Sequence, residues 1–363
     1  MNKFAFKVVN NRGDETQLNL MLTATSNSAL EGIQLGKSTL IKDFFTENPS
    51  HSFSAETLVG SRLYVGYGSM PPAPDPNSNQ YYGWVEFSRN HVDKGVWLNL
   101  SNVDIVGLPL TLKGKLADDG KPFSLGYKKS VKDIISDMKT RALTRQDPAV
   151  VKDCGGGRTK IIAPNIQFPF YRGYDDYLNT LTMSGAKLTI QTDTPKNGPS
   201  KTFTGSFSKG RYQDLANAGP IITITCGSDT FQILKNQFTT EYLYRCDGGN
   251  IILNGESLPQ NRPDNAGRDA SAVYTNSLFR NLCIGINEGY FTAEGPNDSS
   301  KFCSDQPFRN SQGNVYAQIM HETSNSYGFP YADANLKTLL VAAIDSPITL
   351  TILKDEETGD YQG

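Results

Sequence analysis

Short runs of alternating apolar and polar residues are the feature that most constrains the fold. The runs are SRLYVGYGS, VWLNLS, LPLTLKG, GAKLTIQT, PIITITCGS and SPITLTILK, and residues such as Gly, Pro, Asn and Asp break the chain between them. A period of two places one side of each strand on a core and the other side on a polar surface. The chain is therefore predicted to be mainly β.

Two stretches have helical spacing instead. In residues 130–143 apolar side chains recur at three- and four-residue intervals, and Ser130 followed by Asp133 is typical of a helix N-cap. Residues 269–286 show a similar stripe, with Asp269 or Ser271 as the cap. The segments GSMPPAPDPNSNQ and LPQNRPDNAGRD are predicted to be surface loops, because strand patterns continue on both sides.

Charge and composition narrow the classes of partner. The chain has 35 basic and 37 acidic residues, a net charge of −2, so a nucleic acid is not favoured and a neutral ligand is. No apolar segment reaches the roughly 18 residues of a membrane helix, and the N-terminus lacks the apolar core of a signal peptide. The five cysteines contain no C-x-x-C pair. They allow one or two disulfides, with at least one thiol unpaired.

The stretch YYGWVEFSRNHVDKGVWLNLSNVD, residues 81–104, contains both tryptophans and two carboxylates. Alternation places Trp84, Glu86 and Ser88 on one face of the first strand, and Trp97, Asn99 and Ser101 on the polar face of the next. A bulge near Ser101 and Asn102 would return Asp104 to that face. A hairpin centred on Lys94 would then pair Glu86 with Asn102 and Trp84 with Asp104, with the carboxylates about 7–8 Å apart.

Two carboxyl groups at such a separation are what glycoside hydrolysis requires. One protonates the departing oxygen, and the other activates water when roughly 6.5–9.5 Å separates the pair, which gives inversion. Trp84 and Trp97 would offer apolar faces to sugar rings, and Ser88, Asn90, Asn99 and Ser101 would bind hydroxyls. The alternative is that both tryptophans are core residues and both acids lie on a solvated sheet face.

The sequence SRLYVGYGSMPPAPDPNSNQYYGWVEFSRN, followed by VWLNLSNVDIVGLPLTL, is similar to the signature of glycoside hydrolase family 64, the laminaripentaose-producing β-1,3-glucanases. RCDGGN, NSLFRNLCIGINEGYF and IMHETSNSYGFPYADAN extend the resemblance. It implies a mainly β, thaumatin-like sandwich or barrel with a smaller α/β part, the two flanking a wide groove. We expect the β part to comprise residues 1–125, 180–250 and 338–355, and the α/β part residues 126–179 and 251–337.

The resemblance also implies roles for individual residues. The general acid falls on Glu86 and the general base on Asp104. Positions that contact sugar fall on Ser88, Asn90, Trp97 and Ser101, and His321, Tyr331 and Asp333 are further candidates. The family's FPYDD segment is FPYAD here, so Ala332 replaces one aspartate.

The function implied is an inverting endo-type hydrolase of β-1,3-glucan. By the same resemblance it would be a secreted protein, although the chain shows no signal peptide, and a monomer that needs no cofactor or metal. The alternative is a thaumatin-like glucan-binding or defence protein without turnover.

Other motifs favour no different chemistry. His321 and Glu322 lack the second histidine of a zinc-protease motif, because position 325 is Asn325. CGGGRTK lacks the spacing of a phosphate loop. FPFYRGYDDYLN, residues 168–179, is predicted to be either a cleft wall or an aromatic cluster beneath a loop, with the cluster favoured.

Overall fold

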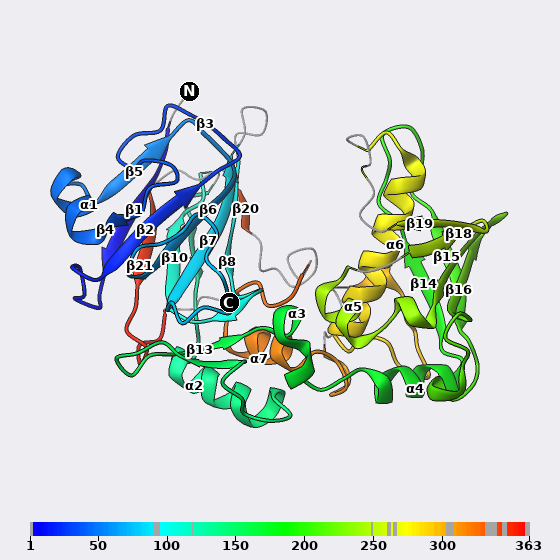
Figure 1. The fold of residues 1–363 in the computed structure, drawn as a ribbon. Coiled ribbons are helices and arrows are strands. Elements are labelled where there is room, and N and C mark those ends of the chain that lie inside the picture. Colours follow the sequence, from blue (N-terminus) through cyan, green and yellow to red (C-terminus); the bar gives the residue numbers. More distant parts are fainter. Residues whose placement is uncertain are drawn as a thin grey trace. The chain divides into compact units, whose positions relative to one another are not determined.

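The computed structural model describes residues 3–89, 95–117, 119–247, 250–259, 263, 267–302, 308–330, 340–342 and 347–359 (Figure 1). The chain divides into two compact units. The first comprises Met1–Phe170, Ile319–Gly328 and Ala332–Gly363, and the second comprises Tyr171–Gln318 and Phe329–Tyr331. This division differs from the expected one, because residues 180–250 lie in the second unit rather than with the N-terminal strands.

A seven-stranded sheet and a five-stranded sheet form most of the first unit. The larger has the order β20 (Leu340–Ala342), β8 (Val96–Ser101), β7 (Tyr82–Arg89), β6 (Thr57–Tyr67), β2 (Leu18–Thr23) and β4 (Thr39–Leu40), with β3 (Ser26–Ser28) paired to β6. The smaller has the order β11 (Pro122–Leu125), β10 (Leu110–Lys115), β21 (Ile348–Ile352), β1 (Phe4–Asn10) and β5 (Ser52–Ala55).

Phenylalanines from the two sheets make a shared core. Phe6 of β1 lies with its ring centroid 4.5 Å from that of Phe87 of β7, and it stacks on Phe53 of β5. Val85 and Phe87 are fully buried, so one face of β7 points into this core and the opposite face carries Glu86. Within the described residues both sheets are open, so the sandwich form of the prediction holds and the barrel form does not.

Smaller elements cover the rest of the first unit. A three-stranded sheet has the order β12 (Val151–Asp153), β13 (Thr159–Ile162) and β9 (Ile105–Val106), and the helices are α1 (Ile41–Glu47), α2 (Val131–Asp137) and α3 (Pro164–Gln167). The chain approaches itself closely where β7 begins: a Cβ on Gly83 would lie 2.3 Å from the carbonyl oxygen of Leu108. Only glycine fits there.

The second unit consists of an antiparallel sheet and helices. The sheet has the order β14 (Lys187–Gln191), β15 (Thr202–Phe207), β16 (Pro220–Cys226), β17 (Asp229–Leu234), β18 (Asn250–Leu253) and β19 (Glu256–Pro259). The helices are α4 (Asp175–Ser184), α5 (Thr240–Arg245), α6 (Ala270–Asn287) and the first part of α7 (Val315–Thr323), and α6 packs against β14 (Figure 1).

Both predicted helices are confirmed. The side chain of Ser130 accepts a hydrogen bond from the backbone N–H of Asp133 at the start of α2, and Asp269 caps α6 through the N–H of Ala272. A turn of π-helix, Met138–Ala142, continues α2. All six predicted strand runs form strands. Four lie in the first unit, as β6, β8, β10 and β21, and two lie in the second, as β14 and β16.

Among the described residues, five α-helices were not predicted: α1, α3, α4, α5 and α7. They are at most ten residues long, which leaves too few turns for the apolar period to be visible.

For FPFYRGYDDYLN the interpretation as an aromatic cluster is correct. The ring centroids of Tyr174 and Tyr244 lie 4.8 Å apart, and both side chains are buried. No helix in the described part of the chain is long and apolar enough to cross a bilayer.

Candidate active site

The outer face of the seven-stranded sheet carries the candidate residues. The register places Glu86 of β7 between Arg62 of β6 and Asn99 of β8. In the same way Trp84 lies between Tyr64 and Ser101. The prediction that alternating residues of β7 and β8 share one face is therefore confirmed.

The predicted register of this hairpin is wrong. Glu86 lies opposite Asn99 rather than Asn102, and Trp84 lies opposite Ser101 rather than Asp104. The turn that fixes the register falls in residues 90–94, outside the described residues. No bulge follows Ser101, because β8 ends there and the N–H of Asn102 donates to the carbonyl of Tyr327, 2.7 Å away. Glu86 and Asp104 are therefore not diagonal neighbours on paired strands, and the separation derived from that register no longer has a basis.

Glu86 is held by an ion pair. Arg62 Nε donates to Glu86 Oε1 at 2.7 Å, and the amide nitrogen of Asn99 lies 3.5 Å from Oε2. The Glu86 side chain is 17% exposed, whereas that of Arg62 is 51% exposed. One carboxylate oxygen is thus firmly bound and the other is only weakly engaged.

Asp104 lies in the bend between β8 and β9. Asn165, from α3, donates to Asp104 Oδ1 at 2.9 Å, and the carbonyl of Asp104 accepts from the N–H of Ala163. Burial raises the pKa of Asp104, while the hydrogen bond from Asn165 and the charge of Arg62 act to lower it. Arg62 therefore acts on both carboxyl groups.

Tyr64 belongs to the same electrostatic group. Burial raises the pKa of the Tyr64 hydroxyl, the hydrogen bond and charge of Arg62 lower it, and the charges of Glu86 and Asp104 raise it. Because both carboxylates affect the pKa of this hydroxyl, Tyr64 lies within electrostatic range of each. The charges of Arg62, Glu86 and Asp104 thus all act on the hydroxyl of Tyr64.

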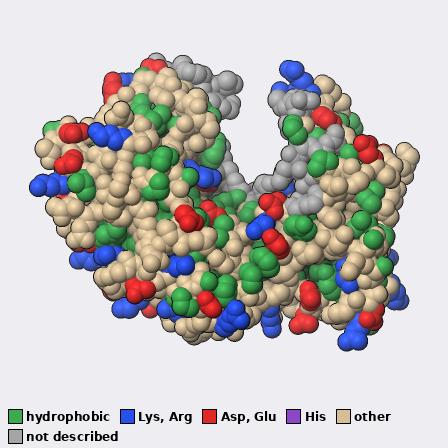
Figure 2. Space-filling model, viewed as in Figure 1, with side chains coloured by type: hydrophobic (Ala, Val, Ile, Leu, Met, Phe, Trp, Pro, Cys, Tyr) green, Lys and Arg blue, Asp and Glu red, His purple; other side chains and the backbone are tan. Residues whose placement is uncertain are grey.

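A cavity of about 500 Å³ opens beside Glu86. Its lining residues come from the first unit alone: Thr23, Ala24, Thr25, Gly60, Ser61, Arg62, Tyr64, Pro72, Ala73, Glu86 and Trp97. Trp97 is 38% exposed, so its ring is available to a ligand. On the face of the molecule that Figure 2 shows, positive and negative side chains are interspersed, which agrees with the small net charge.

Comparison with known proteins identifies the family. The model of the glycoside hydrolase family 64 domain, described as a β-1,3-glucanase, matches residues 68–341. The chain belongs to glycoside hydrolase family 64. It is thus a glycoside hydrolase of the β-1,3-glucanase family, and the matched range includes both Glu86 and Asp104. No curated protein sequence matches this chain.

Solved structures of family 64 share the fold. A laminaripentaose-producing β-1,3-glucanase in complex with laminaritetraose is 14% identical, with a TM-score of 0.58 over 96% of this chain and 98% of that one. A β-1,3-glucanase domain from Clostridium beijerinckii gives 14% identity and a TM-score of 0.57 over the same shares. A laminaripentaose-producing enzyme from Paenibacillus barengoltzii, complexed with laminarihexaose, gives 13% and 0.55 over 96% and 74%.

Trp84 does not offer a surface to sugar in this family 64 chain. It is 2% exposed and packs in a cluster with Met21, Tyr64, Met70, Tyr82, Ile105 and Ile162. Its indole N–H is buried without a hydrogen-bond partner among the described residues. For Trp84 the core interpretation is correct. Trp97 is not a core residue, and its contact with sugar stays a prediction.

Three predicted hydroxyl and amide groups are also buried. Ser88 Oγ accepts from the N–H of Gly60 at 3.2 Å, where the pairing of β6 with β7 is irregular, so this hydroxyl stabilises a bulge. Asn99 and Ser101 are 1% and 2% exposed. None of the three side chains lines the cavity, and of the three only Asn99 contacts Glu86.

Of the remaining candidates, the structure describes only His321. His321 is in α7, where burial and the nearby charge of Lys128 lower its pKa, and it does not line the cavity of Glu86. Asn90, Tyr331 and Asp333 lie outside the described residues. Of the cysteines, Cys154, Cys226, Cys246 and Cys283 form no disulfide in the described part of the chain.

The sequence reasoning missed Arg62, Tyr64 and Asn165. For the first two a signal existed, because Arg62 and Tyr64 alternate in SRLYVGY just as Trp84 and Glu86 do in the next strand. A hairpin of these strands would have placed them on the same face. Asn165 offers no such signal, since it approaches Asp104 only through the tertiary fold.

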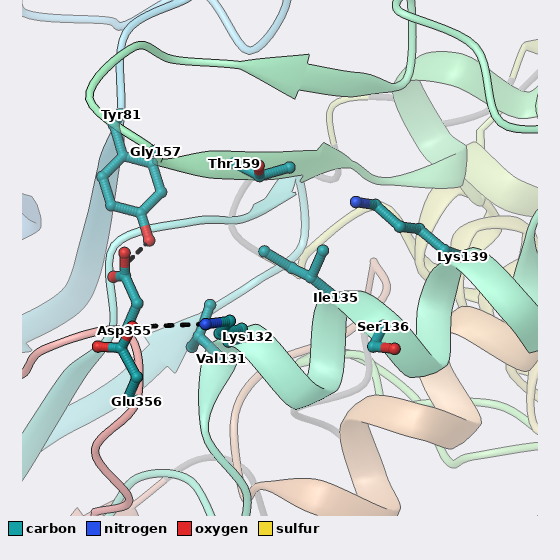
Figure 3. Close-up of a pocket in the computed structure, with 10 residues that line it drawn as sticks. All are labelled: Tyr81, Val131, Lys132, Ile135, Ser136, Lys139, Gly157, Thr159, Asp355 and Glu356. Atoms are coloured by element: carbon teal, nitrogen blue, oxygen red, sulfur yellow. Dashed lines mark hydrogen bonds and ion pairs between the residues drawn. The ribbon is translucent and has the colours of Figure 1, made fainter.

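A second cavity, of about 290 Å³, lies between α2 and the loop before β13 (Figure 3). Its acidic groups already have partners, because the hydroxyl of Tyr81 donates to Asp355 and Lys132 pairs with Glu356 at 3.8 Å. Asp355 also pairs with Arg12. The cavity of Glu86 is the better candidate for catalysis, because a carboxyl group and the exposed ring of Trp97 line it together.

Proposed function

We propose that the protein is an inverting endo-type hydrolase of β-1,3-glucan, with Glu86 as general acid and Asp104 as general base. Family membership supports the reaction class. The observation that carries the assignment of residues is the open cavity in which Glu86 stands beside the exposed ring of Trp97. Asp104 is electrostatically connected to that cavity through Arg62.

The reaction needs a proton on the glycosidic oxygen and a base on the opposite face of the sugar ring. Glu86 gives its proton to the glycosidic oxygen as the bond to the anomeric carbon breaks. Asp104, ionised, takes a proton from water as that water attacks the anomeric carbon from the opposite face. The new reducing end is therefore the α-anomer. A sugar ring packed on Trp97 would hold the chain in position.

The test is hydrolysis of laminarin followed by proton NMR of the anomeric signals. We expect early appearance of the α-anomer with the wild-type protein. Glu86→Gln keeps the shape of the side chain but removes the proton donor, so we expect a loss of at least about 10³-fold in kcat with glucan binding retained. Unchanged activity of this variant would contradict the role of Glu86, and early β-anomer would contradict inversion.

The substrate proposed is laminarin-like or cell-wall β-1,3-glucan, cleaved to laminarioligosaccharides outside the cell by a monomer. The bound oligosaccharides of the solved relatives support this substrate class. Asn90, Tyr331 and Asp333 are further candidates for sugar contacts. Ala332, in place of an aspartate, would change one subsite.

A second candidate function is a thaumatin-like protein that binds glucan without turnover. One observation favours it: Arg62 pairs with Glu86 at 2.7 Å, so this carboxyl group already has a partner within the protein. Sedimentation with insoluble β-1,3-glucan, without release of reducing sugar, would identify this function.

A further inference from the structure

Arg62 lies at the candidate site, but the proposed reaction assigns it no role. It comes from β6, the strand next to that of Glu86, and it lines the same cavity. Burial acts to lower the pKa of Arg62, but the charge of Glu86 and the hydroxyl of Tyr64 raise it overall. A guanidinium in this setting stays charged at every working pH.

The ion pair fixes the orientation of Glu86. Arg62 Nε binds Oε1 at 2.7 Å, while Oε2 has only the amide of Asn99 at 3.5 Å. A protonated Glu86 can still accept the hydrogen bond from Arg62 through Oε1 and carry its proton on Oε2. The contact thus determines which oxygen is available to donate.

The charge of Arg62 also reaches the second acid. Glu86, Tyr64 and Asp104 are the titratable groups of the described residues that Arg62 acts on. Burial disfavours the charged form of Asp104, and Arg62 and the hydrogen bond from Asn165 oppose that effect. A general base must be ionised to take a proton from water.

We propose that Arg62 is a positioning residue for the carboxyl pair: its hydrogen bond to Oε1 orients the proton-donating oxygen of Glu86, and its positive charge also acts on Asp104. This inference rests on the proposed function. Two properties of one side chain are involved, the geometry of its donor and its charge, and two variants separate them.

Arg62→Met removes both the donor and the charge. The pKa of Asp104 then rises further, so the acid limb of the pH profile of kcat/KM moves to higher pH. Misorientation of Glu86 lowers kcat by roughly 10–100-fold. Arg62→Lys keeps the charge but not the planar donor, so its acid limb stays near that of the wild type while kcat falls.

Arg145→Met is the matched control. Arg145 belongs to the same unit and is remote in sequence from the site. Its side chain is 68% exposed, and its Nε lies 3.9 Å from Asp147 Oδ2. We expect neither its kcat nor its acid limb to change. A wild-type acid limb and wild-type kcat in Arg62→Met would overturn the inference while leaving the proposed function intact.

Failure of the proposed function is distinguishable from this result. If the wild-type protein releases no reducing ends from laminarin, the carboxyl carbon of Asp104 is titrated by ¹³C NMR, with Asp104→Asn to assign its signal. A higher pKa of Asp104 in Arg62→Met than in the wild type supports the electrostatic effect of Arg62 on Asp104. Equal values overturn it.

Discussion

The two tryptophans show how strongly the surroundings of a residue determine its role. They belong to the same hairpin and the same sheet face, yet Trp84 is 2% exposed and Trp97 is 38% exposed. The difference arises because side chains from β2, β9 and β13 cover Trp84 and leave Trp97 beside the cavity. Function and stability should therefore divide between them.

Alanine substitutions test this division. Trp84→Ala leaves a large cavity in a packed cluster and should lower the free energy of unfolding by about 3–5 kcal/mol. Trp97→Ala should change stability by less than about 1 kcal/mol but weaken laminarin binding roughly tenfold, or ~1.4 kcal/mol. Denaturant unfolding and binding titrations measure the two effects. The reverse pattern would show that Trp97 has a structural role.

Lys160 is a buried cation that the proposed reaction does not use. Its ammonium donates to the carbonyl of Gln80 at 2.8 Å and stands 4.9 Å from the ring centre of Tyr82. Burial lowers the pKa of Lys160 to about 8, below its ordinary value of 10.5. The unfolded chain therefore binds more protons at this residue between about pH 8 and 10.5, and the folded state gains stability as pH rises through that window.

Replacement of Lys160 by methionine should remove this dependence. We expect the unfolding free energy of the wild type, measured relative to Lys160→Met, to rise by about 1–3 kcal/mol between pH 7 and pH 10. Urea titrations at several pH values give the difference, in which effects of the tyrosines cancel. Lys42→Met, at an exposed position of α1, is the control and should show no such trend. A constant difference for Lys160→Met would disprove the argument.

At the scale of elements, strands were predicted and their pairing was not. Alternation in YYGWVEFSR and VWLNLS is a local property that correctly assigns faces in β7 and β8. The register depends on a turn whose length can change without changing that alternation. Short helices such as α4 also escaped prediction, because packing rather than local preference stabilises them.

Asn287 connects elements of the second unit. Its amide nitrogen donates to the carbonyls of Leu243 and Cys283, and its amide oxygen accepts from Tyr174 and Asn314. The side chain is fully buried. The bonds to Leu243, Tyr174 and Asn314 thus join α6 to α5 and to the segments before α4 and α7.

Asn287→Ala should be strongly destabilising, by roughly 3 kcal/mol or more, because it leaves buried polar partners unsatisfied. Calorimetry should show the transition of the second unit lowered by roughly 5–10 °C. Asn217→Ala, at an exposed position of the same unit, should stay within about 0.5 kcal/mol of the wild type. Equal stability of the two variants would contradict the role of this network.

The division of the whole molecule into two units gives this variant a second readout. Each unit has its own sheet and core, and both tryptophans belong to the first. Tryptophan fluorescence therefore reports the first unit alone. In Asn287→Ala the fluorescence transition should remain near that of the wild type while the calorimetric transition of the second unit moves. Coincident shifts would show that the units unfold as one.

The sequence by itself determined the mainly β class, the polar face that carries Glu86 and the family of the chain. These are properties of local alternation and of a contiguous motif, so residues near one another in sequence suffice to define them. Only the tertiary structure decided that Trp84 is covered, that Ser88 supports a bulge, and that Arg62 holds Glu86. Those outcomes depend on strands and loops distant in sequence, whose approach is fixed by packing and register and not by any local pattern.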